Sequence, residues 1–528
     1  MKLLIVVQIS VQAGIERSHK LITNRVGLSP YSTQRSDKES QLSKFANLYS
    51  LERSKQEWNF GNTQVNLRHK TKSYREHFDM RDTGNSKQPG VTKILLDVTS
   101  NGKDWPSPDM DESYSILVEP DCILIHANET WGALRGLESL SQLMWRTSDG
   151  SQVFINETYV FDRPRYPHRG LMIDTSRNFI SKQILLMNLE AMSYNKLNVF
   201  HWHLTDDNSF PFESLMYPSL SRKGAYNPHQ VYTTNDIREI VEFARLRGIR
   251  VIPELDVPGH TRSWGHGMPE LLSQSSNGGE VQFGALNVLN NHTYEVINNL
   301  LEELFTLFPD EYVHLGGDEV DTSIWHTDPS MITMRNKLGL NGNELLEYFW
   351  RRIFDMVEKL GKKFDGQQKK LVVWEDVINA VKDHPGFLIN QVWQNPMKTG
   401  KSDIIYSKCW YLDLLTNNRA WAPYYTCAEL NEIEQNLKAG QSILGGEACL
   451  WSEFQSDDTI LTRIWPTTSG IAERLWSPSD VINLNTVGPR IEEQRCRMIS
   501  RGIPQAVLQG PGSCQIPGAF VHNQWGHP

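Results

Sequence analysis

Long apolar runs, excess positive charge and metal-ligand patterns are all scarce in this sequence. After the first dozen residues, no apolar run approaches the roughly 20 residues that a membrane-spanning helix needs. The 53 lysines and arginines are outnumbered by 62 aspartates and glutamates, and the net charge of −9 gives no electrostatic case for a nucleic-acid partner. His201 and His203 flank Trp202, but no third and fourth ligand follows at a suitable spacing. We therefore predict no membrane span, no nucleic-acid partner, no metal and no other cofactor.

What the sequence does contain is a series of eight short hydrophobic runs, each ending abruptly in polar or charged residues. Apolar residues at successive positions are typical of parallel strands buried on both faces. Amphipathic segments with helical spacing, such as 235–247 and 293–308, lie between several of the runs. Strand–helix alternation repeated eight times predicts an α/β protein with a (β/α)8 barrel. The runs are 168–179, 196–210, 248–260, 311–319, 370–376, 387–394, 403–413 and 443–453.

The chain is longer than one barrel requires, so the sequence predicts a smaller domain before it. We place the barrel and a C-terminal extension in residues 166–528. Residues 91–165 carry three strand-like runs and one amphipathic helix, as expected for the remainder of a small α+β domain. Residues 1–90 are mostly polar and approach the composition of disorder, although their first residues resemble a signal peptide.

The segment EYVHLGGDEVD, at 311–321, places two adjacent carboxyls, Asp318 and Glu319, at the end of a predicted strand. Two ionised carboxylates this close repel each other, so the pKa of one should rise and allow it to act as a general acid. Gly316 and Gly317 would let substrate or backbone approach closely. The alternative is a solvated pair that caps the next helix. The position of the Asp318–Glu319 pair at the C-terminal end of a barrel strand favours the catalytic interpretation over this alternative.

Nine motifs occur in order between Arg169 and Ser477, within a resemblance that extends from about Tyr114 to the C-terminus: RGLMIDTSRNF, NKLNVFHWHLTDDNSFP, RGIRVIPELDVPGHT, HLGGDEV, VVWED, QVWQ, WYLD, GGEACLWSE and AERLWS. On these motifs the chain resembles the family 20 glycoside hydrolases, in particular the animal lysosomal β-N-acetylhexosaminidase subunits. The resemblance implies release of terminal β-linked N-acetylglucosamine or N-acetylgalactosamine with retention, from glycoconjugates or chitooligosaccharides. The nucleophile would be the 2-acetamido oxygen of the substrate itself.

The resemblance also implies roles for individual residues. Glu319 would protonate the leaving oxygen, Asp318 would orient the acetamide and stabilise its developing charge, and Tyr411 would hydrogen-bond the acetamido oxygen. A box of three tryptophans would surround the acetamido methyl, although a single tryptophan is more often simply core. These tryptophans are Trp374, Trp393 and Trp451.

Other matching residues would bind the sugar hydroxyls. Arg177 and Asp206 match residues that hold the 3- and 4-hydroxyls, and Glu453 matches one on the 4- and 6-hydroxyl side. The alternative for Arg177 is a salt bridge at the barrel rim. His203 and His260 are expected to support the site from behind.

Asp413 and Leu414, at the end of WYLDL, bear on specificity. By the resemblance, a beta-type subunit has Asp then Leu here, whereas an alpha-type subunit has Asn then Arg and accepts sulfated or sialylated substrates. An anion near the sugar 6-position should repel a 6-sulfate, so we expect neutral substrates to be favoured.

Cysteines and sequons give expectations about covalent chemistry and compartment. The resemblance implies a disulfide between Cys496 and Cys514, whereas the other four cysteines mostly fall in apolar runs and look like buried free thiols. Glycosylation sequons, together with the signal-like start, favour a lysosomal or secreted protein. Family members commonly dimerise, so a homo- or heterodimer is expected. The remaining cysteines are Cys122, Cys409, Cys427 and Cys449, and the sequons begin at Asn128, Asn156 and Asn291.

Two other functions compete with this interpretation. The first is a catalytically impaired sugar-binding or recognition protein on the same fold, which the complete set of catalytic residues disfavours. The second is a chitinase of the other substrate-assisted family, whose DxxDxDxE motif is absent.

Overall fold

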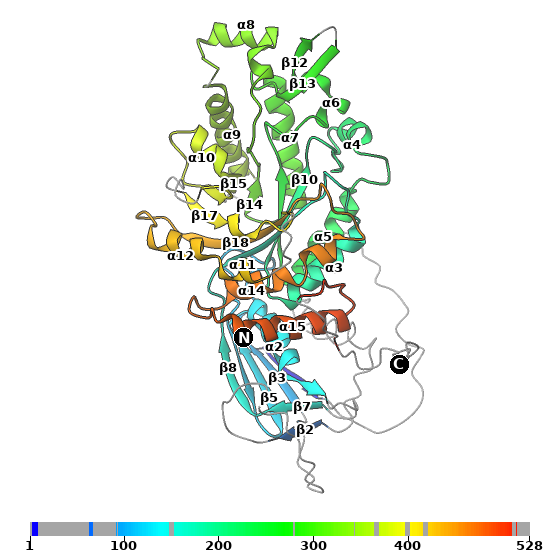
Figure 1. Ribbon diagram of the computed structural model, residues 1–528, viewed down its shortest axis with the longest axis vertical. Coiled ribbons are helices and arrows are strands. Elements are labelled where there is room, and N and C mark those ends of the chain that lie inside the picture. The colour runs from blue at the N-terminus through cyan, green and yellow to red at the C-terminus, as the bar shows by residue number, and fades with distance from the viewer. Residues whose placement is uncertain are drawn as a thin grey trace, which may run out of the picture. The chain divides into compact units, whose positions relative to one another are not determined.

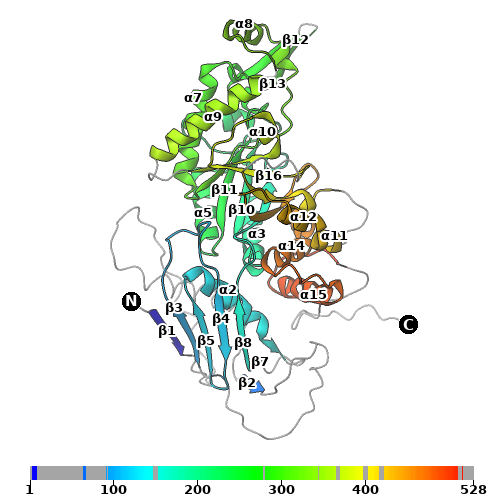
Figure 2. The ribbon, with the colours of Figure 1, turned by 90° about the vertical axis from the view of Figure 1, so that its left-hand side faces the viewer.

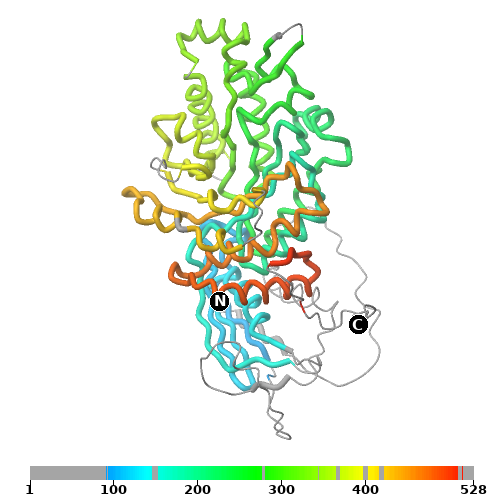
Figure 3. The backbone as a smooth tube through the Cα atoms, viewed as in Figure 1, coloured from blue at the N-terminus to red at the C-terminus, as the bar shows by residue number. Residues whose placement is uncertain are grey.

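Eight parallel strands close into a barrel at the centre of the larger part of the molecule (Figure 1). Each strand pairs in parallel with both neighbours, and the last strand, β18, returns to the first, β9, with Cys449 opposite Met172. The strands are β9 (His168–Asp174), β10 (Val199–Thr205), β11 (Arg250–Leu255), β14 (Tyr312–His314), β15 (Lys370–Trp374), β16 (Leu388–Val392), β17 (Asp403–Tyr406) and β18 (Ile443–Leu450). They follow one another around the barrel in chain order, and the predicted TIM barrel is confirmed. Figure 3 shows the backbone as a tube, coloured from blue at the N-terminus to red at the C-terminus.

The computed structural model describes residues 3–8, 63–66, 91, 93–146, 153–277, 280–342, 344–363, 369–395, 402–414, 421–508 and 514. They divide into two compact units. The smaller unit ends at Arg163, and the larger begins at Pro164 and also takes in Lys103–Asp109. Among these residues, no helix has the length and apolar character needed to cross a bilayer.

Helices surround the barrel because each presents one apolar face to it. Helix α5 (Thr234–Arg245) begins with a capping box between Thr233 and Asp236 and buries Ile237, Ile240, Val241 and Ala244. It and α7 (Asn291–Leu307) lie within two residues of the predicted bounds. The alternation is incomplete at one point, because the described residues between β16 and β17 contain no helix. Other barrel helices are α3 (Lys182–Tyr194), α9 (Glu344–Lys363), α10 (Glu375–Ala380), α12 (Ala428–Gln435), α14 (Thr467–Trp476) and α15 (Leu484–Ser500).

The interior of the barrel is layered, because every second side chain of a strand points inward. Along β10, Val199, His201 and His203 occupy successive layers, while Phe200 and Trp202 pack outward into the main hydrophobic core. The lowest layer is apolar, the next is rich in histidine and glutamate, and tryptophans lie above them. The apolar layer consists of Val199, Ile252, Tyr312, Val372, Ile389 and Ile405.

The smaller unit is built on a five-stranded sheet with the order β1-β3-β5-β4-β8 (Figure 2). Helix α2 (Thr130–Leu143) packs on its central strands, which explains why alternate residues of β4 and β5 are buried. The first strand lies within the stretch that resembles a signal peptide and pairs antiparallel with β3. The sheet strands are β1 (Leu3–Gln8), β3 (Lys93–Val98), β5 (Cys122–Ala127), β4 (Tyr114–Val118) and β8 (Thr158–Asp162). A second sheet contains β2 (Thr63–Asn66), β7 (Val153–Asn156) and β6 (Trp145–Arg146).

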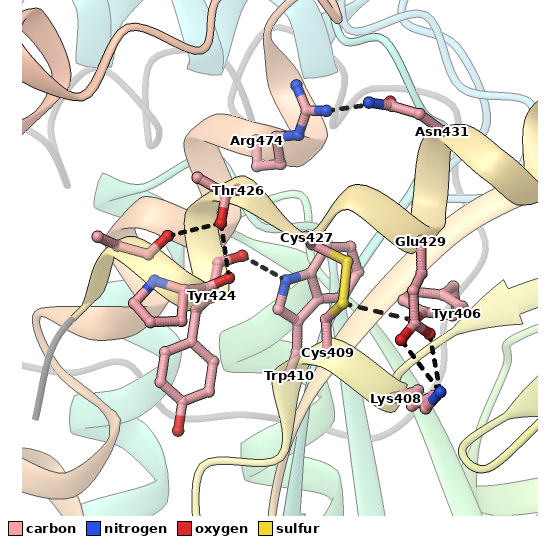
Figure 4. Close-up of a disulfide and its surroundings, with 12 residues drawn as sticks. Tyr406, Lys408, Cys409, Trp410, Tyr424, Thr426, Cys427, Glu429, Asn431 and Arg474 are labelled. Atoms are coloured by element: carbon pink, nitrogen blue, oxygen red, sulfur yellow. Dashed lines mark hydrogen bonds and ion pairs between the residues drawn. A yellow bond between two sulfur atoms is a disulfide. The ribbon is translucent and has the colours of Figure 1, made fainter. Parts of the chain in front are cut away.

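The structure confirms one expected disulfide and corrects the cysteine assignment at another. Cys496 and Cys514 are bonded, as the resemblance implied. Cys409 and Cys427 were expected to be free thiols but form a second disulfide, with Cα atoms 5.8 Å apart (Figure 4). Helix α11 (Trp421–Thr426) lies between them in the chain and ends directly before Cys427. Cys122 and Cys449 are free.

Candidate active site

All eight barrel strands deliver a candidate residue at their C-terminal ends. This arrangement follows from the parallel register, because the carboxyl ends of all strands meet at one rim. In strand order from β9 to β18, the residues are Arg177, Asp206, His260, Asp318 with Glu319, Trp374, Trp393, Tyr411 with Asp413, and Trp451 with Glu453.

The loop after β14 gives the adjacent carboxyls Asp318 and Glu319 different environments. Gly316 and Gly317 have φ of +58° and +98°, and Glu319 itself has φ +49°, a left-handed conformation that is uncommon outside glycine. The side chain of Asp318 is 9% exposed and that of Glu319 is 61% exposed. The left-handed backbone therefore places neighbouring carboxyls in a buried and an open position.

The two glycines allow close packing within the protein. A Cβ on Gly316 would overlap the carboxyl of Asp256 and approach its Cα, and a Cβ on Gly317 would overlap Trp350 and Val377. A close approach by substrate stays a prediction.

Asp318 is the carboxyl of the pair whose pKa is raised. Burial raises the pKa of Asp318 well above its ordinary value, and the nearby carboxyls of Asp256 and Glu254 raise it further against the opposing effect of His260. Its Oδ1 atom is buried and has no hydrogen-bond partner among the described residues. A buried polar atom without a partner is costly, so this oxygen is a candidate for binding a ligand donor.

His260 lies among the carboxyls of the site. Its Nδ1 is 2.6 Å from Oδ2 of Asp256 and 3.9 Å from both Asp318 Oδ1 and Asp206 Oδ2, and its Nε2 is 3.8 Å from Oε2 of Glu319. Burial alone would lower the pKa of His260, but Asp256 and the other carboxylates outweigh it and raise the pKa to about 10. His260 is therefore a cation at neutral and acidic pH, consistent with its expected supporting role.

Asp256 is a site residue that the sequence reading did not select. Its Oδ2 contacts His260, and its Oδ1 accepts a hydrogen bond of 2.9 Å from the backbone N–H of Gly317. This fully buried carboxyl thus ties the loop after β11 to the loop that carries Asp318 and Glu319. The sequence feature that could have identified Asp256 as a site residue is its position in ELDVPGH, directly after a predicted strand.

The three predicted tryptophans and Tyr411 form one aromatic cluster on a floor of Met172 and Cys449. The rings of Trp374 and Trp451 have centroids 5.9 Å apart, and those of Trp393 and Tyr411 stack at 6.2 Å. Hydrogen bonds fix two of the indoles: Trp374 donates to Glu254 at 2.9 Å, and Trp393 donates to Asp376 at 2.9 Å. The cluster is a rigid apolar enclosure with a phenol at its edge.

Tyr411 is aligned by the neighbouring strand β18. It pairs with Cys449, and the next residue, Leu412, donates its backbone N–H to the Cys449 carbonyl at 2.8 Å. Burial raises the pKa of the Tyr411 phenol well above its ordinary value, and the nearby Cys449 and Asp318 raise it further. The phenol therefore stays protonated as a hydrogen-bond donor within electrostatic reach of Asp318.

Arg177 and Asp206 are paired with each other across the rim. Nη2 of Arg177 lies 2.8 Å from Oδ2 of Asp206, Nη1 lies 3.3 Å from Asp174, and the guanidinium lies over the ring of Trp451. Burial would lower the pKa of Arg177, but Asp174 and Asp206 raise it instead. The rim salt bridge considered as an alternative is present, and it orients both side chains.

Asp413 and Glu453 lie close enough to influence each other. Burial raises the pKa of Asp413 to about 6, Glu453 raises it as well, and Arg463 opposes the shift. Oδ1 of Asp413 is buried and, among the described residues, has no hydrogen-bond partner. Leu414, next in the chain, is 53% exposed.

A buried histidine–glutamate cluster supports the site from below, and most of it was missed from the sequence. Glu254 contacts His203 Nδ1 at 2.6 Å, His201 Nε2 at 3.0 Å and His314 Nδ1 at 3.0 Å. His203 in turn contacts Asp206 through Nε2 at 3.0 Å. Glu254 and His203 therefore connect the indole of Trp374 to Asp206.

The same cluster is a poor metal site. His201, Glu254 and His314 offer ligand atoms close together, but the two imidazoles stack at 4.5 Å, so their in-plane lone pairs do not converge. Both Glu254 oxygens also have protein partners, including the Trp374 indole. The absence of a metal stays a prediction.

A (β/α)8 barrel with a carboxyl pair at its rim, beside an aromatic enclosure and an arginine–aspartate pair, defines the class of glycoside hydrolases. The family model described as "Glycosyl hydrolase family 20, catalytic domain" matches residues 166–479, and one described as "beta-acetyl hexosaminidase like" matches residues 7–143. The chain therefore belongs to glycosyl hydrolase family 20, and its enzymatic class is that of the β-N-acetylhexosaminidases. The second match begins at residue 7, within the polar residues 1–90 that contain none of the nine motifs.

Similar proteins include both subunit types. The chain is 41% identical to the beta-hexosaminidase subunit beta of Mus musculus over 431 residues, which cover 79% of this chain and 78% of that protein. It is 39% identical to the subunit alpha of Bos taurus, with coverage of 80% and 81%. Among solved structures, the chitobiase of Flavobacterium johnsoniae superposes with a TM-score of 0.67 at 32% identity, covering 78% of this chain and 63% of that one.

Proposed function

We propose that this protein releases terminal, non-reducing β-linked N-acetylglucosamine or N-acetylgalactosamine by attack of the substrate's own acetamide. The observation that carries the proposal is the buried Oδ1 of Asp318, which has no hydrogen-bond partner among the described residues and lies within electrostatic reach of Tyr411 in the aromatic cluster. A simple two-carboxylate retaining mechanism needs a carboxylate nucleophile facing the sugar carbon. In the acetamide mechanism, the substrate's acetamide N–H instead donates a hydrogen bond to the buried Oδ1 of Asp318, beside the apolar enclosure formed by the tryptophans.

In the first step, Trp374, Trp393 and Trp451 enclose the acetamido methyl and turn the acetamide under the sugar ring. Its N–H donates to Asp318, and Tyr411 donates to its oxygen. As that oxygen attacks the anomeric carbon, positive charge develops on the acetamide. The high proton affinity implied by the raised pKa of Asp318 makes its carboxylate a strong partner for this increasingly acidic N–H.

Glu319 completes the cycle. Its open position at the rim suits a group that protonates the glycosidic oxygen as the bond to the aglycone breaks. The same carboxylate then takes a proton from a water that attacks the anomeric carbon and opens the cyclic intermediate. Two inversions at that carbon give net retention.

Recognition of the sugar follows from the paired and unpaired polar groups at the rim. Arg177 and Asp206, already oriented by each other, suit the 3- and 4-hydroxyls. Oδ1 of Asp413, which has no hydrogen-bond partner in the part of the chain that the structure describes, and the exposed Glu453 suit the 4- and 6-hydroxyl side. With Asp413 and Leu414 in these positions, neutral glycoconjugates or chitooligosaccharides are the proposed substrates.

The proposed location is the lysosome or the cell exterior. The three sequon asparagines, Asn128, Asn156 and Asn291, all lie on exposed surface, where a glycan can be attached. A homo- or heterodimer is the proposed assembly, by analogy with the family. Size measurement of the purified protein by light scattering tests it.

A substrate panel on the purified protein tests the proposed activity. We expect hydrolysis of aryl N-acetyl-β-glucosaminides and galactosaminides, release of the β-anomer first by NMR, and terminal trimming of chitooligosaccharides. No hydrolysis would favour the impaired sugar-binding protein, and internal cleavage of chitin would favour a chitinase. Inversion at the anomeric carbon would exclude the acetamide mechanism.

A further inference from the structure

The disulfide between Cys409 and Cys427 encloses the chain segment that carries Tyr411 and Asp413 (Figure 4). Cys409 lies in the short helical turn Lys408–Trp410, two residues before Tyr411. Cys427 lies between helices α11 and α12. The segment that this disulfide closes therefore contains two of the residues proposed to touch the substrate.

Non-covalent contacts hold this segment on two sides. On the barrel side, Tyr411 and Leu412 align with Cys449 of β18. On the outer side, the indole of Trp410 donates to the Tyr424 carbonyl at 2.9 Å, and the hydroxyl of Tyr424 donates to the Tyr411 carbonyl at 3.3 Å. Helix α11, which carries Tyr424, is thus the outer support of the catalytic tyrosine.

Helix α11 packs against α14 and α15 through Trp421 and Tyr425, and the disulfide joins its C-terminal end to the turn before Tyr411. Cys427, directly after α11, is buried, so the disulfide anchors that end to the turn before Tyr411. Nearby, Tyr406 donates to Glu429 at 2.9 Å, and Lys408 forms an ion pair with Glu429 in which both side chains are more than one third exposed. An exposed ion pair contributes little, so the disulfide is the strongest of these links.

We propose that the Cys409–Cys427 disulfide is a positioning element for catalysis, which keeps the Tyr411 phenol and the Asp413 carboxyl aligned with the tryptophan enclosure. This inference rests on the proposed function. Without the bond, the turn before Tyr411 loses its covalent link to the packed helix α11, and the donor to the acetamido oxygen loses its fixed position while the barrel stays folded. A displacement of about 1 Å at a reacting group can cost ~10²-fold in rate.

The chain offers a matched control. The Cys496–Cys514 disulfide has the same sequence separation of 18 residues, so both bonds restrict the unfolded chain to a similar degree. It joins helix α15 to the C-terminal segment, and no candidate site residue lies in either. A difference in activity between variants that lack one or the other bond therefore reports positioning rather than general stability.

The first experiment compares Cys409→Ser/Cys427→Ser with Cys496→Ser/Cys514→Ser at a temperature where circular dichroism shows both folded. We expect similar decreases in Tm, but a fall in kcat/KM of ~10-fold or more only in the first variant. The inhibition constant of a thiazoline analogue should rise with it, since Tyr411 contacts the cyclised acetamide. Equal activity losses in the two variants, or none in the first, would overturn the proposal.

A double-mutant cycle identifies the residue through which the disulfide acts. In a Tyr411→Phe background, removal of the Cys409–Cys427 bond should lower kcat/KM by at most about a further 2-fold, because the effects of two changes that act through one contact are not additive. Full additivity would contradict a positioning role toward Tyr411.

If the serine variant does not fold, partial reduction of the folded wild type, with alkylated cysteines mapped by mass spectrometry, replaces it. Activity should then fall with alkylation at Cys409 and Cys427, and loss that follows only Cys496 and Cys514 overturns the proposal.

The two hypotheses fail in different ways. A wild-type protein that hydrolyses no sugar of the panel refutes the proposed function, and the inference with it. An active wild type whose two disulfide variants behave alike refutes only the positioning role.

Discussion

The imidazole of His260 lies 3.8 Å from the carboxylate of Glu319, and both residues have left-handed backbones, with φ of +53° and +49°. Lys196 is also left-handed, with φ +57°. Such conformations cost on the order of 1–3 kcal/mol each and persist where surrounding structure enforces them. Here the shared neighbour Asp256 enforces them, by contacting His260 and the Gly317 N–H at once.

Replacement of the proposed acid should depend on the leaving group. In Glu319→Gln, the shape is kept but the proton donor is lost, so kcat/KM for a substrate with a poor leaving group should fall at least ~10²-fold. A nitrophenolate, which departs without a proton, should suffer less. Initial rates with a matched pair of aryl and alkyl glycosides measure the difference. Near-normal turnover of both would remove Glu319 from this role.

The acetamide mechanism predicts strong inhibition by a thiazoline derived from N-acetylglucosamine, because it resembles the cyclic intermediate. Asp318→Asn removes the charge that stabilises this intermediate, so inhibitor affinity and kcat/KM should fall together. Inhibition constants determined for wild type and variant test this. An unchanged inhibition constant in the variant would assign the acetamide to another residue.

Discrimination against a 6-sulfated substrate should depend on pH. The pKa of Asp413 is raised to about 6, so the carboxyl is ionised above that pH and neutral below it. Above pH 7, repulsion of ~1–3 kcal/mol should favour the neutral substrate by roughly one to two orders of magnitude in kcat/KM. Below pH 5 most of this preference should disappear. The ratio of kcat/KM values, measured from pH 4 to 8, gives the profile.

The variant Asp413→Asn with Leu414→Arg is the control for this profile. It should narrow or reverse the preference at neutral pH and make the ratio nearly independent of pH, with neutral turnover mostly intact. A wild type that cleaves both substrates equally at pH 7, or a variant with the wild-type profile, would contradict the assignment.

The loop that carries the carboxyl pair should tolerate no side chain at Gly316. In Gly316→Ala, the new Cβ meets the Asp256 carboxyl in addition to the cost of a left-handed alanine, so unfolding free energy should fall by about 2–4 kcal/mol. Gly339 has a similar φ of +68° but nothing within 4 Å of an added Cβ. Gly339→Ala should therefore cost about 1 kcal/mol. Urea unfolding compares them, and equal losses would show that the contact with Asp256 is unimportant.

The barrel and the rim residues could be predicted because their signals are local. Each strand is a short apolar run, and each candidate residue follows directly after one, so parallel register alone brings them to one rim. The supporting contacts could not be predicted this way. Asp256 and Gly317 are 61 residues apart, and a contact at that distance depends on the closed barrel.

The sequence also could not predict that Asp318 is buried while Glu319 is exposed. Mutual repulsion predicted that one pKa would rise, but burial is the main cause, and burial depends on the left-handed turn at Glu319. The Cys409–Cys427 bond was missed for a similar reason. Both cysteines lie near apolar residues, and only the folded structure shows that they meet.

The continuous chain of contacts from Trp374 through Glu254, His203 and Asp206 to Arg177 has an evolutionary consequence. The residues proposed to read the acetamide and those proposed to read the 3- and 4-hydroxyls share buried partners, so a substitution at one end disturbs the other. Natural variation in specificity should therefore accumulate elsewhere. Asp413 and Leu414, on the loop after β17, take no part in this chain of contacts. They can change without breaking these shared contacts, which makes them the adaptable part of the site.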